Sequence, residues 1–200
     1  MDKDVLLVIV GGVIGLLSSL LTIIAQRKLD EKGELNIFYR FTHEKSKGTS
    51  WGFENESEGR INFKIPVIYE FQNTSNVTRV LRDVSLLLYN KNKFLCKMVQ
   101  ISSITVTTHS GKGVKKETNY SFGTENGSYS FVIDPRSISR IVCEYEYVIK
   151  KCEIQNEVFD TIKLRYFDER NKEHLFTLRN VSNCWEEKTY EADKDWILAK

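Results

Sequence analysis

The side chains of this sequence that are most often catalytic or metal-binding are few, and their spacing matches no familiar site. The three histidines are His43, His109 and His174, and the four cysteines are Cys96, Cys143, Cys152 and Cys184. No two histidines lie four residues apart, as zinc ligands on a helix do, and no Cys-x-x-Cys pair occurs. The phosphate loop and the dinucleotide fingerprint are absent too. We therefore expect a non-enzymatic protein with no metal and no cofactor.

Two of the cysteines allow a second interpretation. Cys96 and Cys143 both fall on the inward side of segments that alternate apolar and polar residues. Buried thiols are common core residues, so we predict that both are reduced and packed in the core. An inter-sheet disulfide is the alternative, and it requires an oxidising compartment.

The nearest approach to a phosphate-binding loop is the basic segment "HSGKGVKK" at 109–116. It lacks the Walker spacing and does not join a strand to a helix. Three interpretations stay open: a nucleotide site, a solvated loop, or a contact with an anionic membrane surface.

The first element that must position any site is an apolar segment at 5–25, "VLLVIVGGVIGLLSSLLTIIA", with no ionisable side chain. As a helix it would extend about 31 Å, the thickness of the hydrocarbon core of a bilayer. The chain starts with "MDKD" and places "QRK" where a signal peptide would be cleaved, so cleavage is disfavoured. We predict a flank at 1–4, a retained transmembrane helix at 5–25 and a juxtamembrane stem at 26–34.

Small residues recur every four positions in this segment, at Gly11, Gly15 and Ser19. They share one face of a helix, and small side chains let two helices approach closely in lipid. Glycine is common in membrane spans without any such role. We nevertheless predict a homo-oligomer that forms through this face.

Basic residues near the ends of the span predict its orientation. Arg27, Lys28 and Lys32 follow the span, whereas Lys3 before it is offset by acidic neighbours. Positive charge is retained on the cytoplasmic side, so we predict that the N-terminus is outside and the remaining domain is cytoplasmic. Six Asn-x-Ser/Thr sequons and the four cysteines favour the opposite, exported, orientation. The sequons begin at Asn55, Asn73, Asn76, Asn119, Asn126 and Asn180.

After the stem the dominant period is two, which is typical of half-buried antiparallel strands. The alternation is clear at 35–41, 61–71 and 140–149, and Pro66 suggests that the second of these is an edge strand. Further strands are expected at 80–90, 94–106, 128–133, 159–167 and 173–179. We predict an all-β domain at 35–180, an immunoglobulin-like antiparallel β-sandwich preceded by one transmembrane helix, with a closed barrel as the second choice. The tail at 181–200 is a possible amphipathic helix, because Trp185, Thr189, Ala192, Trp196 and Ala199 recur at spacings of three and four.

Three stretches of the chain carry a resemblance to a group of bacterial proteins. They are "LLSSLLTIIAQRK", "YEFQNTSNVTRVLRDVSLLL" and "YSFVIDPRSI". Together they resemble uncharacterised single-pass membrane-anchored proteins of low-GC bacteria that have an immunoglobulin-like sandwich. The resemblance implies the fold and its topology, and it brings no catalytic residues.

If successive strands alternate in direction, the loops divide into two sets. Loops 72–79, 107–127 and 150–158 would face the membrane, and loops 42–60, 91–93, 134–137 and 168–172 would face away. The predicted membrane-surface basic residues are Arg27, Lys28, Lys112, Lys115, Lys116, Lys150 and Lys151. Each would gain about 1 kcal/mol near an anionic leaflet.

At the far end, Trp51 and Phe53 lie in a loop rich in glycine and glutamate, which is typical of an exposed recognition site. Packing of both rings over the end of the sandwich is the alternative. Our leading interpretation is a membrane protein whose cytoplasmic sandwich binds a protein or a small ligand, with a self-associating span and no nucleic-acid partner. The alternatives are a membrane-disrupting effector of antiphage defence and an exported adhesion or immunity factor.

Overall fold

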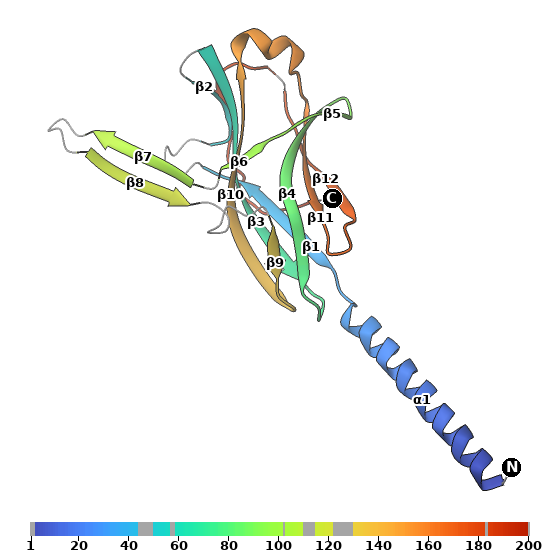
Figure 1. Ribbon diagram of the computed structural model, residues 1–200. Helices are drawn as coiled ribbons and strands as arrows, with labels where there is room; N and C mark the ends of the chain where they lie inside the picture. Colours follow the sequence, from blue (N-terminus) through green and yellow to red (C-terminus); the bar gives the residue numbers. More distant parts are fainter. Residues whose placement is uncertain are drawn as a thin grey trace.

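The computed structural model has a long N-terminal helix followed by an antiparallel β-sandwich (Figure 1). The structure describes residues 3–43, 50–56, 59–101, 103–109, 115–121, 130–182 and 184–199. For residues 5, 6, 103–109 and 115–121 the description is confined to the backbone. Lys112 lies outside the described residues.

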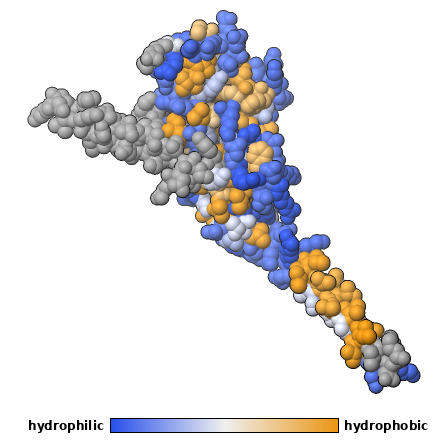
Figure 2. Space-filling model, in the orientation of Figure 1, coloured by the Kyte–Doolittle hydropathy of each residue, from blue (hydrophilic) through white to orange (hydrophobic). Residues whose placement is uncertain are grey.

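Helix α1 (Lys3–Asp30) confirms the helix predicted at 5–25 and extends it into the stem. Its stretch Leu7–Asp30 is long and apolar enough to cross a membrane, and none of its most apolar window is buried inside the chain. Figure 2 shows this apolar surface continuing away from the mixed surface of the head. The helix therefore leaves a full circumference of apolar side chains without a partner in the described chain.

Two antiparallel sheets form the head, and a separate hairpin stands beside them. The first sheet contains β1 (Leu35–Phe41), β2 (Gly52–Asn55), β3 (Arg60–Asn73), β6 (Val99–Ile101), β10 (Ser137–Lys150), β13 (Lys188–Thr189) and β14 (Ile197–Leu198). The second contains β4 (Arg79–Asn90), β5 (Lys93–Lys97), β9 (Phe131–Ile133), β11 (Thr161–Phe167) and β12 (Glu173–Asn180). The hairpin pairs β7 (Ser103–His109) with β8 (Lys115–Ser121), and a 3-10 helix, η2 (Lys151–Asn156), follows β10.

The core lies between the two sheets and follows from the period of two. Alternate residues of β3, from Ile61 to Phe71, point inward and are at most 1% exposed. Leu86 and Leu88 of β4 and Ile162 of β11 meet them from the second sheet, and all three are fully buried. Each large apolar side chain gains about 1.5–3 kcal/mol from such burial. A β-sandwich with one N-terminal helix is therefore confirmed, whereas its immunoglobulin-like type stays a prediction.

The prediction that β3 is an edge strand is wrong. β10 pairs with β3 along its whole length on one side, and β1 and then β2 pair with it on the other. Pro66 lies where β1 has ended and β2 has not begun, and its carbonyl oxygen accepts a hydrogen bond from the Thr42 N–H at 2.9 Å. The backbone nitrogen and oxygen of one residue point to the same side in an antiparallel strand. The missing N–H of Pro66 therefore faces Thr42, just beyond the last paired residue of β1, where the regular pairing of β1 with β3 ends.

The predicted direction of several loops is also wrong. β10 is antiparallel to β3, so that Ser137 pairs with Asn73 beside the helix and Lys150 pairs with Arg60 at the opposite end. The membrane-surface role predicted for Lys150 and for the adjacent Lys151 is therefore contradicted. The loops 134–137 and 168–172, expected far from the helix, lie at its end, as contacts of Arg136 and Arg170 show.

The physical reason is the path of the chain between β5 and β10. The strand predicted at 94–106 is three strands, because the chain crosses from the second sheet to the first through β6 and then turns into the hairpin. The hairpin projects sideways from the sandwich (Figure 1). Lys115 and Lys116 begin β8 in that hairpin, where they pair with His109 and Thr108. The hairpin extends away from α1, which carries Arg27 and Lys28 (Figure 1).

The C-terminal tail forms two short strands where a helix was possible. β13 pairs with β2 and β14 pairs with β1, so the tail covers the outer edge of the first sheet. Between them, Asp193 donates its N–H to the Phe41 carbonyl at 2.8 Å and accepts the Phe41 N–H on its carboxylate at 2.8 Å. Arg179 also donates to this carboxylate at 2.7 Å. The unpaired backbone groups of the sheet edge are satisfied by an extended tail, and a helix would leave them bare.

Replacing Asp193 by alanine removes the carboxylate that Phe41 and Arg179 share. We expect the variant to lose about 2–4 kcal/mol of unfolding free energy, because a part-buried guanidinium and a backbone N–H lose their acceptor. Denaturant unfolding of the full chain in detergent measures this. Asp195→Ala is the control, since Asp195 is exposed on the same tail and should change the value by less than about 0.5 kcal/mol. Equal losses in the two variants would contradict this role of Asp193.

Candidate functional site

The junction between α1 and the sandwich is a fixed joint. Asn76 donates its backbone N–H to the Asp30 carbonyl at 3.0 Å, and Thr74 donates its own to the Glu34 carbonyl at 3.0 Å. The Glu34 N–H in turn donates to the Thr74 hydroxyl at 2.8 Å. Gly33 ends the helix with φ +132, and a Cβ there would come within 2.7 Å of the Ser75 backbone. Only glycine allows the stem to lie this close to the turn between β3 and β4.

A buried asparagine holds that turn together. Asn73 is 2% exposed. Its side-chain amide nitrogen donates to the carbonyls of Val77 at 2.8 Å and Asp134 at 2.9 Å. Its amide oxygen accepts the Ser75 N–H and hydroxyl. Three chain segments thus meet on one side chain. The nitrogen that a glycan would modify at this sequon is occupied in the folded head.

A cavity of about 330 Å³ opens at this same end of the sandwich, and we call it the mouth pocket. Its lining residues are Glu34, Leu35, Arg79, Val80, Tyr166, Asp168, Glu169, His174 and Phe176. They come from the start of β1, the start of β4, the end of β11 and the first half of β12. Antiparallel pairing of β11 with β12 brings Tyr166 opposite His174. The pocket therefore has an apolar wall from strand interiors and a charged rim from strand ends.

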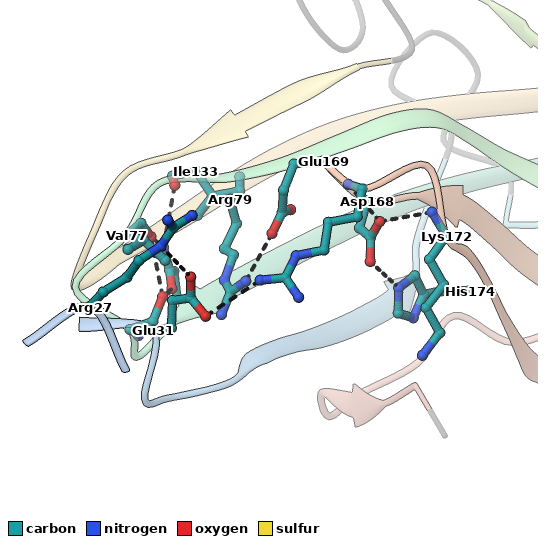
Figure 3. Close-up of polar contacts among 12 residues, drawn as sticks. Arg27, Glu31, Val77, Arg79, Ile133, Asp168, Glu169, Lys172 and His174 are labelled. Atoms are coloured by element: carbon teal, nitrogen blue, oxygen red, sulfur yellow. Dashed lines mark hydrogen bonds and ion pairs between the residues drawn. The ribbon is translucent and has the colours of Figure 1, made fainter. Parts of the chain in front are cut away.

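An Asp–His pair forms one side of the rim (Figure 3). The His174 Nε2 lies 2.8 Å from Asp168 Oδ2, and the other Asp168 oxygen accepts the backbone N–H groups of Arg170 and Lys172, both at 2.9 Å. Burial raises the pKa of Asp168, but the hydrogen bonds from His174 and from these two N–H groups outweigh it and lower the pKa below its ordinary value. The carboxylate therefore stays charged and holds the imidazole in one orientation.

Tyr166 stacks on His174 with ring centroids 4.7 Å apart and planes 7° from parallel. Burial, and then the negative charges of Asp168 and Glu169, raise the pKa of Tyr166 to about 12. Tyr166 is therefore a neutral ring in the pocket wall at physiological pH.

A chain of ion pairs runs from the pocket to the helix. Arg79 contacts Glu169 at 3.0 Å on the rim, and Arg170, the residue after Glu169, contacts Glu31 directly after α1 at 3.4 Å. Glu31 also contacts Arg27, four residues before it, at 3.3 Å. Figure 3 shows Arg27 and Glu31 on one side of this chain of contacts, and Arg79 and Glu169 beside them. Each exposed pair contributes little to stability, yet together they place the helix end against the pocket turn.

The residues that line the mouth pocket include no side chain that a histidine could activate as a nucleophile. An Asp–His pair activates a serine, threonine or cysteine in hydrolases, and none of these lines the mouth pocket. Within the described ranges, no group of three or more metal-ligating side chains is close enough to hold an ion.

The partner-binding role predicted for Trp51 and Phe53 is wrong, because both rings are buried, at 2% and 1% exposure. Trp51 stacks on Tyr190 of the tail at 4.1 Å and donates its indole N–H to the Glu191 carbonyl at 2.9 Å. Phe53 packs on Phe63 with centroids 4.5 Å apart. The alternative, that the rings close over the sandwich end, is the arrangement observed.

The three small residues of the helix lie on its exposed surface. Ser19 donates its hydroxyl to the Gly15 carbonyl at 2.9 Å within the helix. A Cβ at Gly11 or Gly15 would meet no atom within 4 Å. No contact inside the described chain requires glycine at these positions, and their role in self-association stays a prediction.

All four cysteines are free, so the inter-sheet disulfide is not present. Cys143 is fully buried and Cys96 is half-buried, and burial raises the pKa of each thiol to about 12. Both are therefore protonated packing residues. Cys152 is the exposed one of the four.

The sequence analysis missed the mouth pocket. Asp168 and His174 flank the turn "DERNK", and pairing the two strands across that turn places Tyr166 beside His174. The contribution of Arg79 has no such local signal, because it comes from a strand far away in the sequence.

Comparisons with protein-family models, with curated proteins and with solved structures found no match to this chain.

Asp168 gives the head a testable dependence on pH. Its pKa in the folded chain is below the ordinary 3.8, so its stabilising contribution is complete above about pH 5 and is lost as the pH falls through the folded pKa. Asp168→Asn should lower the unfolding free energy by about 1–2 kcal/mol at neutral pH and should flatten its decline below about pH 4. Denaturant unfolding at a series of pH values measures both effects. Asp134→Asn, an exposed acid at the same end, should leave the curve unchanged; an unchanged curve for Asp168→Asn would contradict the ion pair with His174.

Proposed function

We propose that this chain is a non-enzymatic, single-pass membrane protein whose cytoplasmic β-sandwich binds a small ligand or a protein, and whose span self-associates. The observation that supports it most is the contrast between head and helix. The sandwich buries its core without α1, while the apolar side chains of Leu7–Asp30 have no cover in the described chain. Lipid supplies that cover, since α-helices are the elements that satisfy their own backbone groups in a bilayer.

Positive residues near the end of the helix support the cytoplasmic orientation. Arg27 and Lys28 are exposed there, and the fold adds Arg136 and Arg170, whose loops were predicted to face away. Basic side chains at the surface of a bilayer favour its anionic cytoplasmic leaflet. Free cysteines and the occupied Asn73 amide are consistent with a domain that is neither oxidised nor glycosylated.

A membrane-disrupting effector remains the second candidate, on one specific observation. The turn that carries Asp168 and Glu169 of the mouth pocket also carries Arg170, which contacts Glu31 directly after the helix. A ligand in the pocket would therefore contact the same turn that contacts the end of the span. Clustering of spans on ligand binding would then be the route to permeabilisation.

Self-association depends on Gly15 in this proposal. Gly15→Leu fills the close-approach face and should reduce cross-linked oligomer in membranes at least about fivefold, because packing between helices in lipid depends on backbone proximity. Cross-linking in native membranes, followed by electrophoresis, measures it. Val13→Leu introduces the same side chain on the opposite face and should keep the oligomer. Loss in both variants, or in neither, argues against a specific interface.

Cys152 reports the location of the head. In intact cells an impermeant maleimide should leave the chain unlabelled, and permeabilised cells should give labelling that Cys152→Ser removes, because Cys152 is the exposed thiol. Labelling of intact cells would overturn the orientation. Extraction of the chain by alkaline carbonate without detergent would overturn the membrane span itself.

A further inference from the structure

We propose that the mouth pocket binds an organic ammonium group attached to a small apolar body. This inference rests on the proposed ligand-binding function and names the chemistry of the ligand. The residues around the cavity come from four strands and the stem, so their charges are brought together only in the folded head.

The rim carries more negative than positive charge. Glu34, Asp168 and Glu169 supply three carboxylates, against the guanidinium of Arg79 and the imidazole of His174. Arg79 forms an ion pair with Glu169, and the His174 ring nitrogen contacts the Asp168 carboxylate. Two of the three carboxylates are therefore already engaged in contacts within the rim.

Glu34 is the carboxylate that remains for a ligand. Both of its backbone polar groups bond to Thr74, which fixes the position of the residue at the stem. Its side chain is exposed at the pocket rim and makes no hydrogen bond or ion pair with a described residue. A carboxylate held on a rigid backbone loses little freedom when a cation binds, so it is a suitable primary contact.

The wall of the pocket suits an apolar body beside that charge. Leu35, Val80 and Phe176 are half-buried and contribute carbon surface, with the Phe176 ring as the accessible aromatic group, whereas Tyr166 is 6% exposed and stacked on His174. Aromatic rings and carboxylates together are the groups that recognise organic ammonium ions. The volume of about 330 Å³ is at the lower end of ligand pockets, which limits the ligand to a small molecule or a headgroup.

The same charges disfavour an anionic ligand. A phosphate or carboxylate at the Arg79 nitrogen that contacts Glu169 would have to displace that side chain, and it would meet Asp168 and Glu34 on the rim as well. At contact distance each like-charge pair costs energy that one guanidinium does not offset. The pocket therefore selects for positive charge, although basic residues are frequent on the exposed surface around it.

The ammonium group has two possible sources, since the pocket lies at the helix end of the head. One is a free amine, and the other is the headgroup of a zwitterionic lipid such as phosphatidylethanolamine. Both present the same group to Glu34, and the experiment separates them.

The test is calorimetric titration of the full-length chain in phosphatidylglycerol nanodiscs with ethanolamine and with tetramethylammonium chloride, at constant ionic strength. We expect saturable binding of at least one of them, and a Kd at least about tenfold weaker in Glu34→Gln, because one charge-assisted contact is lost. Glu173→Gln is the matched control, since Glu173 is exposed nearby on β12 and does not line the pocket. Equal binding in Glu34→Gln, or binding of inorganic phosphate in place of both amines, would overturn the proposal.

A second arm repeats the titration in phosphatidylethanolamine nanodiscs. Weaker apparent binding there than in phosphatidylglycerol indicates competition by the lipid headgroup, and equal binding indicates a free amine; either supports the ammonium chemistry. Absence of binding to any probe, in a chain that passes the membrane and cross-linking tests, removes this inference and leaves the membrane-protein proposal in place.

Discussion

The burial of one face of β3 is the interaction on which the rest of this structure depends. β3 is long enough to pair with β10 throughout and with β1 and β2 in succession, so it sets the register of the first sheet. Its inward residues, from Ile61 to Phe71, then fix which residues of the second sheet can pack opposite them. A shift of one residue would turn this apolar set to solvent. The positions of all the loops at either end of the sandwich follow from that register.

The register also determines what surrounds the helix. Asn73 ends β3 beside the stem, and it is here that the turn after β3, the turn before β10 and the stem are joined by hydrogen bonds. Gly33 allows the stem to approach that turn without a clash. The head is thereby attached to α1 through backbone bonds over a short distance, and motion of one is transmitted to the other more directly than through a flexible linker.

Polar residues at this joint serve two structures at once. Asp168 organises the turn between β11 and β12 and orients His174 in the mouth pocket, while Arg170 in the same turn reaches Glu31 directly after the helix. The pocket and the helix contact thus share one short segment. Exposed ion pairs of this kind add little stability.

Local patterns determined much of this protein. The apolar segment at 5–25, the Arg27–Glu31 pair and the stop at Gly33 are properties of adjacent residues, and helix geometry alone relates them. The alternation in β1, β3 and β10 likewise identifies the inward side of each strand. These features predicted the helix, the all-β class and the inward faces of β1, β3 and β10.

The tertiary structure decided what depends on the path of the chain between elements. The crossover through β6 reversed the expected placement of Lys150 and Lys151, since alternation along a strand carries no information about how many reversals precede it. Trp51 and Phe53 were buried by a tail far away in the sequence, whose own spacing suggested a helix. The mouth pocket brings Glu34, Arg79 and His174 together from distant segments. Period and composition are local properties, whereas a pocket at the end of a sandwich is made by pairing between strands, and only the folded chain fixes that pairing.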